Sequence, residues 1–72
     1  MEELKVSLLE AADMMYAGEE SAGVELLMRH VGAIGGIPGV AIWVNPLFDA
    51  LDRADYIYAA DLICREIAVL IA

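Results

Sequence analysis

Basic residues are scarce in this sequence. Four lysines and arginines stand against twelve aspartates and glutamates, which gives a formal net charge of -8. Each arginine follows an acid by four residues, as in Glu25 and Arg29, Asp49 and Arg53, and Asp61 and Arg65. In a helix this spacing places both charges on one face and pairs them. Nucleic acids and anionic membrane surfaces are bound by patches of unpaired basic side chains, so we expect neither as a partner.

Cysteine and histidine each occur once, as Cys64 and His30. A single cysteine cannot form an intrachain disulfide. The segment Met1–Lys5 lacks the basic start and the apolar run of a secretory signal. These observations predict a cytoplasmic protein.

The same scarcity argues against a metal centre or a nucleophilic enzyme. Neither Glu20 nor Glu25 stands three or four residues from His30, the spacing that brings ligands together on one helix face. Cys64 falls on an apolar stripe, where burial keeps a thiol protonated and inert. We therefore predict no catalytic residue, no metal ligand and no cofactor.

Continuous apolar runs long enough to cross a membrane are also missing. The stretch from Val31 to Phe48 has no Asp, Glu, Lys or Arg and approaches the length of a spanning helix. Glycine and proline interrupt it at Gly32, Gly35, Gly36, Pro38, Gly39 and Pro46. Because these residues break a helix and leave backbone groups that lipid cannot satisfy, we expect no membrane-spanning segment.

Hydrophobic side chains are abundant instead, at 61% of the 72 residues against 22% charged. This balance excludes a disordered chain, which would be poor in apolar side chains. The length allows a single domain, residues 1–72, and domains of this size rarely bury a strong core alone. The surplus of apolar side chains therefore favours a covering partner.

Apolar residues recur every three to four positions in the first half of the chain, as in amphipathic helices. A first helix is predicted over residues 2–17, with Gly18 at its C-terminal cap. Its apolar stripe consists of Leu4, Leu8, Ala11, Ala12 and Met15. A second helix is predicted to follow Glu19-Glu20-Ser21 and to end near Gly35 and Gly36. Its apolar stripe consists of Val24, Leu27, Met28, Val31 and Ile34.

The middle of the chain carries conflicting signals. Ile37-Pro38-Gly39 is a turn sequence, and we expect residues 36–44 to be irregular or briefly helical. Asn45 followed by Pro46 favours a helix start, because asparagine caps well and proline suits the first helical position. A short third helix is therefore predicted from Asn45, with an apolar side formed by Leu47, Phe48 and Leu51.

The last third predicts a fourth helix from Tyr56 to about Ile71, capped by Asp55. One apolar side consists of Ile57, Ala60, Cys64, Ile67 and Ile71. A second apolar side consists of Tyr58, Leu62 and Val69. A helix that is apolar over most of its circumference requires cover on both sides.

These patterns predict an all-α protein, a small antiparallel bundle of three or four helices with an irregular middle segment that contains glycine and proline. The expected core includes Leu8, Met15, Leu27, Val31, Leu51, Ile63 and Ile67. Because symmetric dimers are the commonest oligomers, the doubly apolar fourth helix predicts a homodimer. The candidate interface residues are Tyr58, Leu62, Val69 and Ile71.

One part of the sequence is similar to a known family. The segment from Asp55 to Ile63, followed by Glu66 and Ile67, resembles the closing helix of an uncharacterised family of small helical bacterial proteins. At this point that family typically reads Asp-Tyr, three apolar residues, Asp and two apolar residues. The resemblance covers the last third of the chain, and it implies helices and protein interaction without any known activity.

Two classes of function follow from these observations. The sequence favours a small acidic, non-enzymatic interaction module, an adaptor or chaperone-like protein that self-associates and binds a partner helix. The alternative is a ligand-binding protein or enzyme subunit with a pocket at the dimer interface. That pocket would use His30, Tyr56, Tyr58 and Asp61.

Overall fold

The computed structural model describes residues 2–71, which contain helices and turns and no strand. The α-helices are α1 (Glu2–Tyr16), α2 (Glu20–Arg29), α3 (Val31–Ile34), α4 (Ala41–Asp52) and α5 (Tyr56–Leu62). The chain then continues as a π-helix, η1 (Ile63–Ile67), and a 3-10 turn, η2 (Ala68–Leu70). The predicted all-α class is confirmed, whereas the grouping into an antiparallel bundle of three or four helices stays a prediction. The two ends of the predicted domain, Met1 and Ala72, lie outside the described residues.

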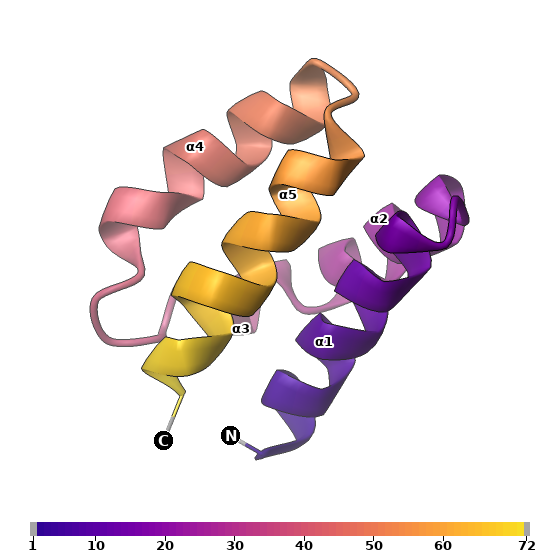
Figure 1. Cartoon of the computed structure of the whole chain (residues 1–72). Coiled ribbons are helices and arrows are strands. Elements are labelled where there is room, and N and C mark those ends of the chain that lie inside the picture. The colour runs from indigo at the N-terminus through magenta and orange to yellow at the C-terminus, as the bar shows by residue number, and fades with distance from the viewer. Residues whose placement is uncertain (1, 72) are drawn as a thin grey trace.

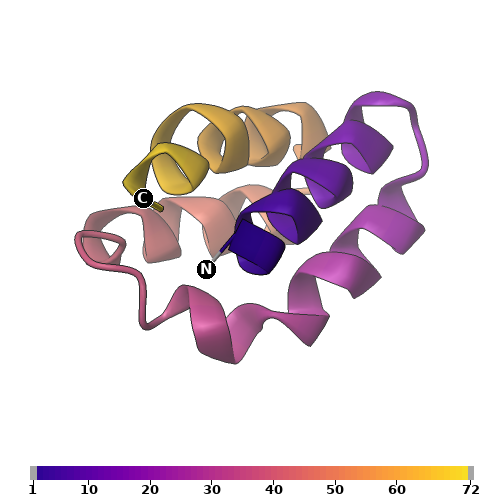
Figure 2. The same cartoon turned by 90° about the horizontal axis from the view of Figure 1, so that it is seen from below.

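The last helix lies at the centre of the packing. In Figure 1, α5 runs beside α1, while α4 covers the other side of α5 and α2 covers α1. Figure 2 shows the same helices from below, arranged around a shared interior. Within residues 2–71, α2 packs closely against α1 and α4 packs closely against α5, but α2 and α4 do not pack closely against each other. No helix in this part of the chain combines the length and apolar character needed to cross a bilayer.

The first helix follows its sequence pattern. Every member of its predicted apolar stripe is buried. Gly18 has a φ of +86°, the left-handed conformation that glycine adopts without strain. The N–H of Gly18 donates to the carbonyl of Met15, and the N–H of Glu19 donates to that of Met14, at 3.2 and 2.8 Å. This pair of bonds is the Schellman pattern, so Gly18 caps α1 as its position predicts.

The second predicted helix is divided into two. α2 ends at Arg29 and α3 begins at Val31, with the N–H of His30 bonded to the carbonyl of Leu27 at 3.0 Å in a tighter turn. This break shifts the helical phase of the residues that follow. Leu27 is buried, whereas Val31 is 40% exposed, so the prediction of Val31 as a core residue is wrong.

The third predicted helix begins earlier than its capping signal indicates. Residues 35–40 form turns, as the glycines and Pro38 favour, but α4 starts at Ala41 and carries Pro46 in its interior. Ile37 and Val40 are buried at 2% and 3% exposed and anchor the chain in front of Ala41. This burial outweighs the single hydrogen bond that a proline cannot donate, so the predicted start at Asn45 is wrong.

The fourth predicted helix begins at its predicted cap, but its hydrogen-bonding pattern changes before it ends. The N–H of Tyr58 donates to Oδ1 of Asp55 at 3.3 Å, which confirms Asp55 as the N-cap. Beyond Leu62 the backbone widens into η1, where π-helical bonds replace the α-helical ones. The two sides of this segment are covered by α1 and α4. The chain thus covers part of this helix itself, while Ile57, Tyr58 and Val69 stay exposed.

Candidate functional site

The four candidate interface residues do not share one surface. Leu62 and Ile71 are 4% and 3% exposed and belong to the core of this chain. Tyr58 and Val69 are exposed, at 43% and 65%. Of the four candidates, Tyr58 and Val69 therefore present side chains that a second molecule would meet, whereas Leu62 and Ile71 do not.

The residues of the alternative pocket are dispersed. Tyr58 lines an open groove along α4, whereas His30, Tyr56 and Asp61 do not line it. Within residues 2–71, no three side chains among His, Cys, Asp and Glu are grouped to hold a metal ion. Within one chain the groove therefore contains one of the four residues, and the alternative of a pocket at a dimer interface stays a prediction.

Asp61 instead joins α5 to α1. The hydroxyl of Tyr16 donates a hydrogen bond to Oδ1 of Asp61, and this bond raises the pKa of Tyr16 to about 12. The predicted ion pair between Asp61 and Arg65 is absent from the described residues, since Arg65 lies on the wider turn of η1. Burial raises the pKa of the neighbouring Cys64 thiol, with Asp13 adding to the effect. The phenol of Tyr16 and the thiol of Cys64 therefore keep their protons at neutral pH, and the Tyr16–Asp61 bond ties α1 to α5.

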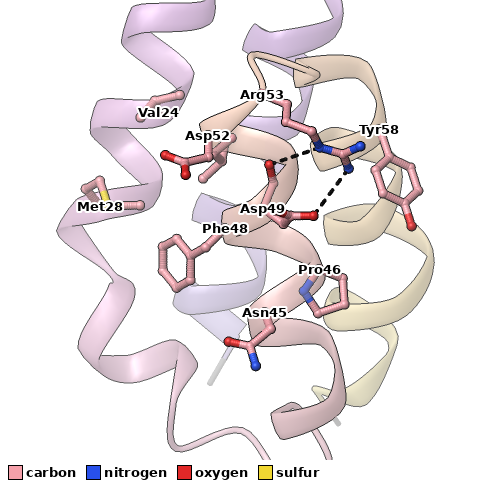
Figure 3. Close-up of a pocket in the computed structure, with 10 residues that line it drawn as sticks. Val24, Met28, Asn45, Pro46, Phe48, Asp49, Asp52, Arg53 and Tyr58 are labelled. Carbon is pink, nitrogen blue, oxygen red and sulfur yellow. Dashed lines mark hydrogen bonds and ion pairs between the residues drawn. The ribbon is translucent and has the colours of Figure 1, made fainter.

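An open groove of about 850 Å³ follows α4 (Figure 3). Val24 and Met28 lie on α2, one turn apart, and Phe48 lies opposite them on α4 (Figure 3). Met28 and Phe48 are 38% and 37% exposed, and Val24 is half-buried. We call these three residues, together with Leu51, the apolar wall of the groove.

Polar side chains border this apolar wall. Nη2 of Arg53 lies 3.6 Å from Oδ2 of Asp49, and Nε of Arg53 donates to the backbone carbonyl of Asp49 at 3.4 Å. Asp52 projects from α4 toward α2 (Figure 3) and makes no ion pair within residues 2–71. Asn45 adds a neutral amide farther along α4. The border therefore contains one neutralised charge pair and one unpaired carboxylate.

The sequence pattern missed this groove because it identifies apolar helix faces without showing which of them face each other. Val24 and Met28 belong to the predicted stripe of the second helix, and Phe48 belongs to that of the third. Their spacing correctly identifies apolar faces of helices. What the pattern lacks is the separation between α2 and α4, which leaves both faces partly open. The ion pair of Arg53 with Asp49, by contrast, forms where the four-residue spacing predicts it.

Comparisons with protein-family models, with curated proteins and with solved structures find no significant match to the chain. They therefore do not test the resemblance of the last third to small helical bacterial proteins, which stays a prediction.

Proposed function

We propose that this protein is a non-enzymatic interaction module that holds an apolar helical segment of a partner protein between α2 and α4. The observation that carries the proposal is the apolar wall, in which Met28 and Phe48 face a common open groove while each is more than one-third exposed. Concave apolar surfaces on small proteins are typical of binding sites. Amphipathic helices bind in such grooves through apolar side chains spaced by three or four residues.

The composition of the groove also favours binding over catalysis. Its charged lining consists of the Arg53–Asp49 pair and the single carboxylate of Asp52. General acid–base chemistry relies on a titratable donor and acceptor held within reach of each other. Met28 instead contributes a flexible, polarisable side chain that adapts to differently shaped partners. An adaptor or chaperone-like role in the cytoplasm is the form of this proposal that agrees with the acidic sequence.

Self-association through the last helix is a separate part of the proposal. Tyr58 and Val69 are its accessible residues, and the intrachain cover of α5 limits the surface that a second copy would bury. Light scattering at micromolar concentration tests it. A mass of twice 7.8 kDa, reduced to 7.8 kDa by Tyr58→Asp with Val69→Asp, supports the dimer. A single 7.8 kDa species in the unmodified protein contradicts it.

The docking proposal is tested by crosslinking from inside the groove. The photoreactive residue p-benzoylphenylalanine is introduced in place of Phe48 in the native cells, and a matched variant carries it in place of Ile42, which is 71% exposed and outside the groove. We expect the first variant to crosslink to an apolar helical segment of another protein, identified by mass spectrometry. We also expect Met28→Asp to abolish that adduct. Equal adducts from both positions, or none from Phe48, contradict the proposal.

A further inference from the structure

We infer that the partner segment is a short amphipathic helix with basic residues beside its apolar face. This inference rests on the proposed function and identifies the chemistry of the occupant. It rests on how the charges around the apolar wall are paired. Both arginines of this region form ion pairs, whereas two of its acids form none within residues 2–71.

The arginines nearest the groove are already neutralised. Arg53 is paired with Asp49, and Nη2 of Arg29 lies 3.3 Å from Oε1 of Glu25 on α2. Asp52 has no such partner within residues 2–71 and points toward α2 (Figure 3). A cation on an incoming helix would therefore meet an unpaired carboxylate, whereas an anion would meet like charge.

A second acid extends this charge along α2. Glu20 precedes Val24 by one helical turn and is exposed, so it lies on the same face as Val24 and Met28. It makes no ion pair among the described residues. At the end of the groove near Val24, Asp52 on α4 therefore lines the groove, and Glu20 lies one helical turn beyond Val24 on α2. The opposite end carries the neutral amide of Asn45.

The dimensions of the groove limit the length of the occupant. From Asn45 to Asp52 the rise of an α-helix amounts to about 10 Å. That length accommodates about two turns of a bound helix in contact, with apolar side chains at i, i+3 or i+4, and i+7. A segment of about three turns would also place a basic residue beside Asp52.

The charge of the chain argues against a second copy as the occupant. A second copy would bring a further net charge of -8 toward a surface that is itself acidic. Two of its four basic side chains are already held in intrachain ion pairs. Association of like-charged surfaces is disfavoured, so a basic helix from another protein is the complementary occupant.

Two synthetic helical peptides of about fourteen residues serve as probes for this inference. Both carry leucines spaced by three and four residues, and one has lysines where the other has glutamates. Binding is followed by fluorescence anisotropy with the full chain and with three variants: Phe48→Ser in the apolar wall, Asp52→Asn in the border, and Glu10→Gln on α1. Glu10→Gln is the matched control, because it removes one exposed acid far from the groove.

We expect the lysine peptide to bind at least about tenfold more tightly than the glutamate peptide, because the groove border is acidic. Asp52→Asn should weaken its binding about threefold and added salt should weaken it further, while Glu10→Gln leaves it unchanged. Equal affinities for the two peptides, both lost in Phe48→Ser, would overturn the basic-helix inference and leave the docking groove intact. Binding that Phe48→Ser does not alter, or no binding of either peptide, overturns the docking groove as well.

Discussion

Gly23 shows how one residue sets the distance between two helices. A Cβ at this position would lie 2.9 Å from the carbonyl oxygen of Ala11 and 3.0 Å from Cγ of Met15. The close approach of α1 and α2 therefore depends on the missing side chain, which also allows Met15 to be 1% exposed.

Gly23→Ala should lower the free energy of unfolding by about 1–3 kcal/mol, because backbone atoms of α1 must move to relieve the clash. Gly32→Ala is the control, since a Cβ there has no heavy atom within 4 Å. We expect that control to raise stability by up to about 1 kcal/mol through helix propensity. Urea denaturation of both variants measures the difference. Equal effects would show that α1 and α2 are not packed this closely.

Tyr16 contributes a pH-dependent contact between α1 and α5. Its bond to Asp61 raises the pKa from the ordinary 10.0 to about 12, because the bond holds the phenol proton and the carboxylate repels a phenolate. The folded state therefore binds this proton more tightly than the unfolded state. The resulting stability is fully present below about pH 10 and is lost as the pH rises to about 12.

A nuclear magnetic resonance titration of the tyrosine ring carbons tests this assignment. We expect one ring to titrate near pH 12 and its signal to disappear in Tyr16→Phe. Asp61→Asn should shift that titration to lower pH, because the acceptor loses its charge. An unchanged titration in Asp61→Asn would show that Asp61 does not hold the Tyr16 proton.

At the scale of elements, α1 and α4 end in the same hydrogen-bonded motif built from different residues. After α4, the N–H groups of Ala54 and Asp55 donate to the carbonyls of Leu51 and Ala50, at 3.0 and 2.8 Å. Ala54 consequently has a φ of 58°, in the left-handed region where Gly18 closes α1. An alanine side chain is strained there, whereas glycine is not.

Exchanging the two cap residues should therefore have opposite effects. Ala54→Gly should raise the free energy of unfolding by about 0.5–1 kcal/mol, the relief of strain being partly offset by the greater entropy of glycine in the unfolded chain. Gly18→Ala should lower it by about 1–2 kcal/mol. Thermal denaturation followed by circular dichroism distinguishes the signs. A loss of stability in Ala54→Gly would contradict the cap geometry.

Replacement of Pro46 tests where α4 begins. If the helix started at Asn45, replacement of Pro46 would remove a favourable residue of the first turn. Because α4 begins at Ala41, Pro46→Ala instead restores a hydrogen bond to the carbonyl of Ile42 and should stabilise the protein by up to about 3 kcal/mol. Guanidinium denaturation gives the sign, and a destabilised variant would place the helix start near Asn45.

At the scale of the whole molecule, the interior is shared by helices from both ends of the chain. Leu8 of α1, Leu27 of α2 and Leu47 of α4 join Ile63 and Ile67 of η1 in one buried cluster. No described side chain leaves a buried polar nitrogen or oxygen without a partner. Stability therefore depends mainly on how completely this small apolar cluster is filled.

Leu27 and Val31 provide a comparison at this scale, because the sequence pattern predicts both as core. Leu27 is 1% exposed, so Leu27→Ala should cost about 2–5 kcal/mol, enough to unfold a domain of this size. Val31 is 40% exposed, and Val31→Ala should cost less than about 1 kcal/mol. Far-ultraviolet circular dichroism and urea titration report both changes. Similar losses in the two variants would contradict the division of the second predicted helix.

The sequence alone determined the features that depend on neighbours along the chain. The α1 stripe, the Gly18 and Asp55 caps and two of the three predicted arginine pairs follow from spacings within one or two helical turns. These contacts form within one helix or at its ends, and residue type and spacing suffice to predict them. The all-α class follows for the same reason.

Only the tertiary structure decided which apolar faces are covered and by what. Three changes of the backbone alter which way the following side chains point. They are the division at His30, the start of α4 at Ala41 and the widening at Ile63. The last helix packs against both α1 and α4, which cover much of it within the chain, while the separation of α2 from α4 leaves Met28 and Phe48 open. Burial depends on contacts between residues distant in sequence, and periodicity carries no information about those distances.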